Sequence, residues 1–251
     1  MRIVRRIADL HPLAGDVGLV PTMGALHAGH EALLRAARAE NDTVVVSVFV
    51  NPAQFDDAGD LAAYPRDEAR DTRVAEAAGA DVLFAPPVEE LYPPGFQTWV
   101  EVEELSRGLE GEHRPGHFRG VATVCLKLFN IVRPRSAYFG QKDAQQLAVL
   151  RRMVRDLDLE VTITSAPTVR DADGLAVSSR NARLSPSERQ TALALPRALA
   201  TRDLAAARAA LAGLDVDYVE IADFDPPVLA AAVRIGSTRL IDNVVLEEEK
   251  R

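Results

Sequence analysis

The chain has 251 residues and a formal net charge of −8, from 29 lysine and arginine residues against 37 aspartate and glutamate residues. Proteins that bind nucleic acid or an anionic membrane need a net or clustered basic surface, so this charge argues against both classes of partner. The single cysteine excludes an internal disulfide bond and a zinc site with several thiolates. No apolar run approaches the roughly 18–20 residues that span a bilayer, and the first residues lack the apolar region of a signal peptide. We therefore expect a soluble, cytoplasmic protein of one large or two modest domains.

The first two thirds of the chain alternate between strand-like and helix-like segments. The run 43–50 (TVVVSVFV) is apolar and mostly β-branched, which is typical of a strand buried on both faces of a parallel sheet. In chain order, strands are predicted at 17–20, 43–50, 81–84, 136–139 and 160–164, and helices at 31–39, 66–78, 121–132 and 143–156. This alternation predicts an α/β fold with a doubly wound, parallel, Rossmann-like sheet.

The pattern changes near Pro167. A turn signal at 171–174 predicts a hairpin within 169–177. After it, helices are predicted at 186–200 and 203–212, and strands at 215–221, 233–235 and 239–246, with a charged, frayed tail at 247–251. We therefore predict a nucleotide-binding domain over 1–168 and a smaller α+β C-terminal lid domain over 169–251.

The most informative stretch is residues 21–30 (PTMGALHAGH), between the first predicted strand and the first predicted helix. Ligands of open α/β sheets bind outside the carboxyl ends of strands, where this loop lies. Gly24 and Gly29 allow the main chain to approach a phosphate, and a helix that starts near His30 offers it free N–H groups. His27 and His30 are three residues apart, so one helical turn can aim both imidazoles at the same phosphates.

Two other interpretations of the histidine pair are open at this point. A zinc ion needs three or four ligands, and His113 and His117 could supply the rest, although Arg114-Pro-Gly116 between them predicts a loop. Alternatively, the two histidines are unrelated surface residues. The chain lacks both the P-loop signature and a G-x-G-x-x-G after the first strand, which disfavours a P-loop kinase and a standard dinucleotide dehydrogenase.

The segment His27-Ala-Gly-His30 resembles the HxGH motif of the nucleotidyltransferase superfamily, and the longer string at 21–30 is similar to that of the pantoate–β-alanine ligase (pantothenate synthetase) family. The resemblance extends over nearly the whole chain. Further similar segments follow in the same order: 49–55 (FVNPAQF), 64–66 (YPR), 114–118 (RPGHF), 139–143 (FGQKD), 145–146 (QQ), 178–181 (SSRN) and 239–243 (RLIDN).

The resemblance implies a two-step reaction. The pantoate carboxylate attacks the α-phosphorus of ATP to give pantoyl adenylate and pyrophosphate, and the amine of β-alanine then displaces AMP to give pantothenate. It implies ATP as a substrate, Mg²⁺ as its companion ion, pantoate binding in the first domain, and a homodimer. Its partners would be small molecules, without nucleic acid or membrane. The first step gathers negative charge, so it requires donors and cations around the phosphates.

By the same resemblance, His30 is the proton donor and two later segments hold ATP. Lys142 stands out in a chain that uses arginine 26 times and lysine three times, and its compact ammonium suits phosphate as a point charge. Two hydroxyls and a guanidinium at 178–180 suit departing pyrophosphate. The expected catalytic residues are His27, His30, Lys142, Ser178, Ser179 and Arg180. The expected ATP-binding residues are Met23, Gly24, His27, Gly29, His30, Gly140, Lys142, Asp143, Val169, Val177, Ser178, Ser179 and Arg180.

Each of these residues also has a simpler interpretation. Lys142 could be a surface lysine, the serines could cap a helix, and Asp143 could cap the next helix or bind ribose or magnesium. No metal ligand is assigned. Gln54 and Gln146 are the expected substrate-binding residues: Gln54 for pantoate and β-alanine, Gln146 for pantoate. An amide donates and accepts at once, as the hydroxyls of pantoate require, although either glutamine alone could be an ordinary polar residue on the surface.

Two further segments carry expectations. Cys125 lies in an apolar stretch and is predicted to be a small core residue rather than a nucleophile. Residues 56–63 read as a mobile loop beside Gln54, and we expect it to close over the adenylate and keep water out.

Three features depart from the family pattern. An arginine, Arg70, stands where relatives commonly carry one of two acidic residues, so no magnesium role is assigned to 67–71. Gln141 replaces a frequent glutamate beside Lys142, and residues 223–227 pass to the last strands without the longer excursion of relatives.

Two alternative functions are carried forward. One is another HxGH nucleotidyltransferase that keeps the nucleotide on its product. The other is an inactive relative that binds nucleotide as a sensor or scaffold.

Overall fold

The computed structural model describes residues 1–246, and the predicted frayed tail lies outside them. The chain forms two compact units. The first unit comprises residues 1–140 and 145–166, and the second comprises residues 141–144 and the chain from Pro167 onward. No helix among the described residues is long and apolar enough to cross a membrane.

The first unit contains a six-stranded sheet in which every neighbouring pair is parallel. The strand order is β1-β4-β3-β2-β5-β6. The bounds are Arg2–Val4 (β1), Val17–Thr22 (β2), Thr43–Val48 (β3), Val82–Phe84 (β4), Ser136–Gly140 (β5) and Thr162–Ala166 (β6). From β2 the chain builds the sheet to one side, and from β5 to the other, so the switch point of the topology lies between these two strands.

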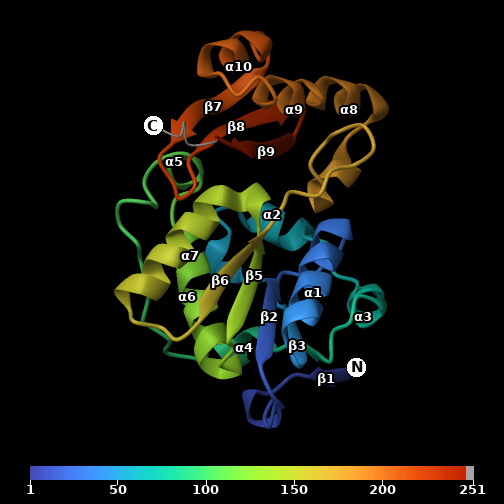
Figure 1. The fold of residues 1–251 in the computed structure, drawn as a ribbon, viewed down its shortest axis with the longest axis vertical. Helices are drawn as coiled ribbons and strands as arrows, with labels where there is room; N and C mark the ends of the chain where they lie inside the picture. The colour runs from blue at the N-terminus through green and yellow to red at the C-terminus, as the bar shows by residue number, and fades with distance from the viewer. Residues whose placement is uncertain (247–251) are drawn as a thin grey trace. The chain divides into compact units, whose positions relative to one another are not determined.

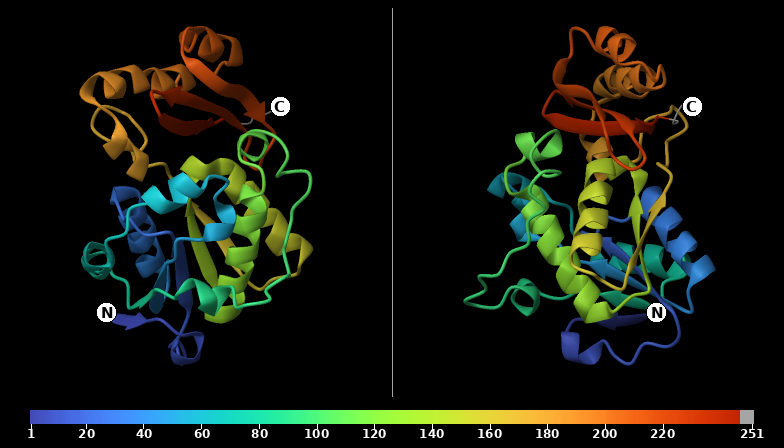
Figure 2. Two further views of the ribbon diagram at one scale, coloured as in Figure 1. Left: turned by 180° about the vertical axis from the view of Figure 1, so that it is seen from behind. Right: turned by 60° about the vertical axis from the view of Figure 1, so that its left-hand side comes forward.

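Helices cover both faces of this sheet (Figure 1; Figure 2, right). Alternate residues of each strand enter two separate apolar clusters, because successive side chains of a strand point to opposite faces. Leu19 of β2 packs with residues of α6 (His117–Val132) and α7 (Ala144–Asp156), whereas Val20 packs with residues of α1 (Ala28–Glu40) and α3 (Glu68–Ala77). The helices are η1 (Ile7–Asp9), α1 (Ala28–Glu40), η2 (Pro52–Gln54), α2 (Ala58–Ala63), α3 (Glu68–Ala77), α4 (Val88–Leu91), α5 (Glu110–His113), α6 (His117–Val132) and α7 (Ala144–Asp156).

The second unit contains a three-stranded antiparallel sheet in the order β7-β8-β9. Its elements are η3 (Gln141–Asp143), η4 (Ser179–Arg183), α8 (Pro186–Ala192), α9 (Ala194–Leu199), α10 (Leu204–Ala210), β7 (Asp215–Ala222), β8 (Val228–Ile235) and β9 (Thr238–Val245). One apolar cluster joins the helices to one face of the sheet. The doubly wound parallel sheet and the smaller α+β part are thus confirmed; the lid role of the second part stays a prediction.

Two predicted elements need correction, and a third forms as predicted but with little strand pairing. The helix predicted at 186–200 is two helices that meet at Leu193, where Pro196 near the start of α9 has no N–H to continue the earlier helix. The strand predicted at 233–235 is the end of an eight-residue strand, β8, whose alanines carry little strand signal. The predicted hairpin at 169–177 forms, but with a single bridge, Arg170 to Ala176.

The segment predicted as a mobile loop, 56–63, is for the most part the helix α2. Asp57 caps its first turn by accepting a hydrogen bond from the N–H of Asp60 at 2.8 Å. At the other end, Arg66 donates to the main-chain oxygens of Leu61 and Tyr64. Local side-chain caps therefore give this short segment its helical form.

Candidate functional site

The loop at 23–27 leaves the carboxyl end of β2 and is held by a buried carboxylate. Asp71 of α3 is 1% exposed, and it accepts hydrogen bonds from the main-chain N–H groups of Ala25 (2.9 Å) and Leu26 (2.7 Å). Gly24 has φ of +84°, and a Cβ there would lie 2.8 Å from a carboxylate oxygen of Asp71. The loop therefore requires glycine at 24 and an acceptor at 71, and sequence reasoning assigned no role to Asp71.

His27 and His30 form a capping box at the start of α1. The helix begins at Ala28, with His27 as its N-cap, rather than near His30 as predicted. His27 Nδ1 accepts a hydrogen bond from the N–H of Gly29 (3.2 Å), and His30 Nδ1 accepts from the N–H of His27 (3.3 Å). The two rings stack with their centroids 4.0 Å apart.

These main-chain hydrogen bonds decide the tautomer of both rings. A neutral imidazole carries one proton, and a main-chain N–H can only donate, so Nδ1 is the acceptor and Nε2 carries the proton. Each ring therefore presents an Nε2–H donor beside the N-terminus of α1, where the helix dipole also favours an anion. This arrangement is suited to phosphate oxygens.

Gln54 is oriented by Asn51, a residue that sequence reasoning missed. Asn51 is buried, its Oδ1 accepts from Ala53 N–H and Tyr92 O–H, and its Nδ2 donates to the main-chain oxygen of Gly120. Asn51 Nδ2 also donates to Gln54 Oε1 at 2.9 Å. Main-chain groups fix the orientation of the Asn51 amide, and Asn51 in turn fixes the orientation of the Gln54 amide. Gln54 Nε2 donates to no described residue. Gln54, which is 8% exposed, can thus offer N–H donors to a substrate oxygen.

His117 holds the main chain at Gln54. Its Nε2 lies 3.1 Å from Arg114 Nη1, which can only donate, so His117 Nδ1 is the donor to the main-chain oxygen of Gln54 at 2.9 Å. Gly120 of α6 allows the close approach, since a Cβ there would lie 2.3 Å from the main-chain oxygen of Ala53. Both ring nitrogens of His117 take part in these hydrogen bonds. The structure therefore does not support His117 as a metal ligand together with His27 and His30.

The two glutamines on α7 have different surroundings. Gln145 is buried, accepts from the N–H of Glu110 and donates to the main-chain oxygens of Leu105 and Gly108. Gln146 is only half-buried, so its amide is accessible to a ligand.

In the second unit, strand β9 contacts both η3 and η4, and so brings together the segments around Lys142 and 178–180. Lys142 Nζ lies 3.7 Å from Asp143 Oδ1. Asp143 belongs to the η3 turn before α7, not to the helix itself. Ser178 is the N-cap of η4 and accepts from the N–H of Arg180, which confirms the capping interpretation for that serine.

Other predicted site residues of the second unit lie on the hairpin. Val177 N–H donates to the main-chain oxygen of Val169 at 2.9 Å. In the first unit, Gly140 closes β5 at the carboxyl edge of the sheet, where the loop after β2 also begins. The predicted site residues other than Gly24 and Gln54 are all half-buried, which leaves them accessible.

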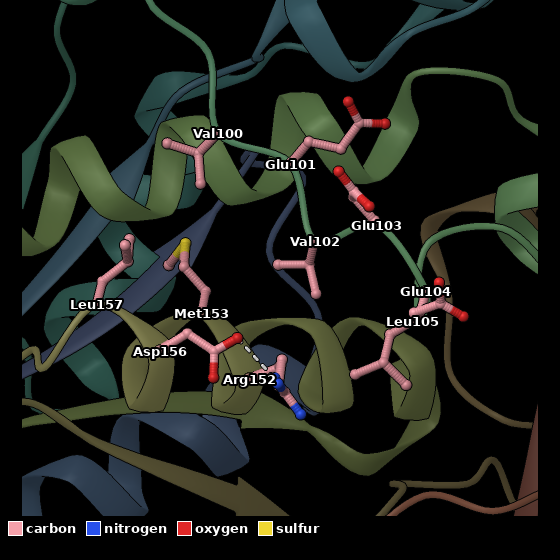
Figure 3. Close-up of a pocket in the computed structure, with 10 residues that line it drawn as sticks. All are labelled: Val100, Glu101, Val102, Glu103, Glu104, Leu105, Arg152, Met153, Asp156 and Leu157. Atoms are coloured by element: carbon pink, nitrogen blue, oxygen red, sulfur yellow. Dashed lines mark hydrogen bonds and ion pairs between the residues drawn. The ribbon is translucent and has the colours of Figure 1, made fainter.

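A pocket of about 420 Å³ in the first unit (Figure 3) is lined by none of the predicted site residues. It is lined by residues 100–105 and by α7, where Arg152 bonds Asp156 at 2.6 Å. Glu101, Glu103 and Glu104 line one side, so the pocket disfavours a triphosphate.

Cys125 is confirmed as a core residue. It is buried in the cluster under α6, and burial raises the pKa of its thiol to about 12. A thiol in this state is not a nucleophile at neutral pH.

Comparisons with known proteins identify the family. The sequence profile described as pantoate–β-alanine ligase matches residues 2–245. A pantothenate synthetase of Heliobacterium modesticaldum is 56% identical over an alignment of 280 positions, gaps included, which covers 98% of this chain and 100% of the relative. One from Geobacter sulfurreducens is 49% identical, with full coverage of both chains. The Heliobacterium alignment is longer than this chain, so that relative carries residues which this chain lacks.

Solved structures agree. The crystal structure of pantothenate synthetase from Thermus thermophilus is 47% identical, with a TM-score of 0.93, over 98% of this chain and 99% of that one. The Francisella tularensis pantoate–β-alanine ligase, complexed with β-γ ATP and β-alanine, is 35% identical, with a TM-score of 0.86, over 98% of this chain and 97% of that one. This chain belongs to the pantoate–β-alanine ligase family.

Proposed function

We propose that the chain condenses pantoate with β-alanine at the expense of ATP, and releases pantothenate, AMP and pyrophosphate through a pantoyl-adenylate intermediate. The observation that carries this proposal is the capping box at His27 and His30. It fixes two Nε2–H donors at a helix N-terminus, in a chain of the pantoate–β-alanine ligase family.

The proposed roles follow from the chemistry of each group. In the first unit, His27 and His30 donate to phosphate oxygens as charge gathers at the α-phosphorus, with the main chain at Met23, Gly24 and Gly29 alongside. Gln54 and Gln146 bind the oxygens of pantoate, and Gln54 also binds β-alanine. In the second unit, Lys142 supplies a point charge, and Ser178, Ser179 and Arg180 bind the departing pyrophosphate. Gly140, Asp143, Val169 and Val177 complete the proposed ATP-binding set.

Mg²⁺ is proposed as a companion of ATP. Among residues 1–246, no three His, Cys, Asp or Glu side chains gather into a group that could hold a metal ion. Mg²⁺ does not require such a group, because it keeps several waters and takes phosphate oxygens with one or two carboxylates. Asp143 beside Lys142 is a suitable carboxylate. The ion would neutralise part of the charge that builds on the phosphates.

The homodimer and the cytoplasmic location implied by the family resemblance are also proposals. Sedimentation of the purified protein at several concentrations tests the first, and fractionation of the source cells tests the second.

The decisive experiment mixes the purified protein with ATP, Mg²⁺, pantoate and β-alanine, and omits each substrate in turn. We expect AMP, pyrophosphate and pantothenate in equal amounts only in the complete mixture. AMP formation that ignores pantoate would overturn the proposal. Pyrophosphate release without AMP, with nucleotide retained on the product, would indicate the alternative nucleotidyltransferase. ATP binding without turnover would indicate the inactive relative.

A further inference from the structure

Two adjacent residues of β9, Asp242 and Asn243, are polar and nearly inaccessible. They are 2% and 5% exposed, respectively. They lie in the family-like segment 239–243, to which the proposed reaction assigns no role. A buried polar group costs stability unless it is hydrogen-bonded, so the partners of these two residues indicate what they are for.

Asn243 binds the two main-chain carbonyl groups that flank the Lys142 Cα. Its Nδ2 donates to the main-chain oxygens of Gln141 and Lys142, both at 2.9 Å. Since main-chain oxygens only accept, the orientation of the Asn243 amide is fixed, and its Oδ1 faces Gln141 Nε2 at 3.4 Å. A glutamine can donate to this oxygen and a glutamate cannot, so the departure of Gln141 from the family pattern fits the contact.

Asp242 holds the hairpin of residues 169–177. Its two carboxylate oxygens accept from the two Nη atoms of Arg170, at 2.7 and 3.1 Å. This bidentate geometry fixes the orientation of the guanidinium as well as its position. Arg170 in turn forms the bridge to Ala176, one residue before Val177.

The two contacts are joined to each other. The N–H of Asn243 donates to Asp242 Oδ1 at 2.8 Å, the oxygen that also accepts from Arg170. A continuous series of hydrogen bonds therefore runs from the hairpin through Asp242 and Asn243 to the main chain of Lys142. Every member belongs to the second unit.

We propose that Asp242 and Asn243 are positioning residues, which hold the Lys142 segment and the 169–177 hairpin in one fixed arrangement for the phosphates of ATP. This inference rests on the proposed function. Neither residue touches substrate; each acts by placing segments that do. Preorganised groups stabilise developing charge without rearrangement, and a small displacement of such groups is costly in rate.

The test substitutes Asn243→Asp and measures the KM for ATP, the KM for pantoate and kcat for AMP release. The change keeps the size of the side chain but places carboxylate oxygens against two main-chain oxygens. We expect kcat/KM for ATP to fall by about 10–100-fold, with the KM for pantoate unchanged. The control, Asp217→Asn, removes an ion pair of Asp217 with Arg234 and Arg239 on the same sheet, and is expected to leave both constants unchanged.

Arg170→Lys is the second variant, for the case that Asn243→Asp does not fold. It keeps the charge but loses the bidentate geometry, and the same ATP-specific fall is expected. Wild-type kinetics in a folded variant, or an equal fall for ATP and pantoate, would overturn the proposal. An ATP-specific fall in Asp217→Asn would also overturn it, because any weakening of the sheet would then suffice.

Calorimetric titration of the same variants with ATP and Mg²⁺ separates the two hypotheses. If the wild-type protein makes no AMP, the proposed function fails. Weaker ATP binding by Asn243→Asp than by Asp217→Asn would still support the positioning role, and equal binding would refute it.

Discussion

At His27 and His30, hydrogen bonds from the main chain decide which ring nitrogen accepts and which carries the proton. The N-cap of a helix is more often Ser, Thr, Asp or Asn, whose oxygen accepts from the first turn. Here Nδ1 of the His27 imidazole takes that role, so Nε2 of the same ring carries the proton. In the proposed site, one side chain thus both caps the helix and donates to the anion at its N-terminus.

His30 also has two roles that mutation can separate: its Nδ1 accepts from the N–H of His27, and its Nε2–H is the proposed donor to phosphate. His30→Asn keeps an acceptor near the position of Nδ1 but has no group at the position of Nε2. We expect its stability to stay near that of the wild type, while adenylation falls by about 10²–10⁴-fold, as for loss of a positioned donor. His30→Ala should lose both. Pyrophosphate release and urea unfolding measure the two effects.

The matched control is His11→Ala, because the His11 ring contacts the main-chain oxygen of Ile131 and has no proposed role. It should retain wild-type turnover. Near-normal turnover in folded His30→Asn would remove His30 from the proposed role.

Cys125 is expected to resist thiol reagents in the native protein. Burial raises its pKa to about 12, so the reactive thiolate is scarce at pH 8 and forms only well above that pH. Ellman's reagent should react with this thiol only after denaturant is added. Rapid labelling of the native protein, at a rate faster than its unfolding, would contradict the burial.

At the scale of elements, the loop between β2 and α1 depends on a helix that is distant in sequence. Asp71→Asn replaces one of two carboxylate oxygens with a donor, so one of the N–H groups of Ala25 and Leu26 loses its acceptor. An unsatisfied buried donor costs about 1–3 kcal/mol, and we expect the free energy of unfolding to fall by that amount. Adenylation should fall as well, because the loop leads into His27.

Asp67→Asn is the matched control, since Asp67 caps the same helix from an exposed position. It should cost less stability and leave adenylation unchanged. Equal kinetics in Asp71→Asn and Asp67→Asn would show that the loop does not depend on the buried carboxylate.

The helix α2 is the element that could protect the intermediate. Phe55 precedes α2 and Tyr64 follows it, and their rings make an edge-to-face contact with centroids 5.7 Å apart. Asp57 and Arg66 cap the two ends of the helix. Its role as a lid stays a prediction. The double variant Asp57→Ala, Arg66→Ala should fray the helix, admit water to the adenylate and raise AMP above pantothenate. Asp203→Ala, which removes the cap of α10, is the control. Strict coupling of AMP to pantothenate in the double variant would contradict the lid.

Sequence patterns predicted the elements whose signal is local. The run 43–48 is β-branched and appears as β3, while β1, three residues with charged neighbours, has no such signal. The same distinction holds for the site. His27 and His30 lie within one motif, whereas Asp71 acts on residues 45 and 46 positions earlier, and Asn243 on residues more than 100 positions earlier. Contacts of that separation follow from the fold and not from periodicity or spacing.

At the scale of the whole molecule, the negative net charge and an anionic substrate are compatible because charge is local. The formal charge of −8 includes glutamates at 101, 103 and 104, which line a pocket apart from the proposed site residues. The proposed site residues instead carry helix N–H groups, imidazole donors, an ammonium and a guanidinium. We therefore expect electrostatic attraction for ATP to depend on these few groups and not on the net charge.

The proposed reaction passes one oxygen atom from pantoate to AMP. In the first step a carboxylate oxygen of pantoate bonds to the α-phosphorus, and pyrophosphate leaves. In the second step the amine attacks the acyl carbon, the bond between that carbon and the shared oxygen breaks, and the oxygen departs with AMP. Pantoate labelled with ¹⁸O in its carboxylate should therefore give AMP with one heavy oxygen, detected by mass spectrometry. Label in the carboxylate of β-alanine, the control, should not reach AMP. A route through an acyl phosphate would instead place the label in inorganic phosphate beside ADP, and unlabelled AMP would exclude the adenylate.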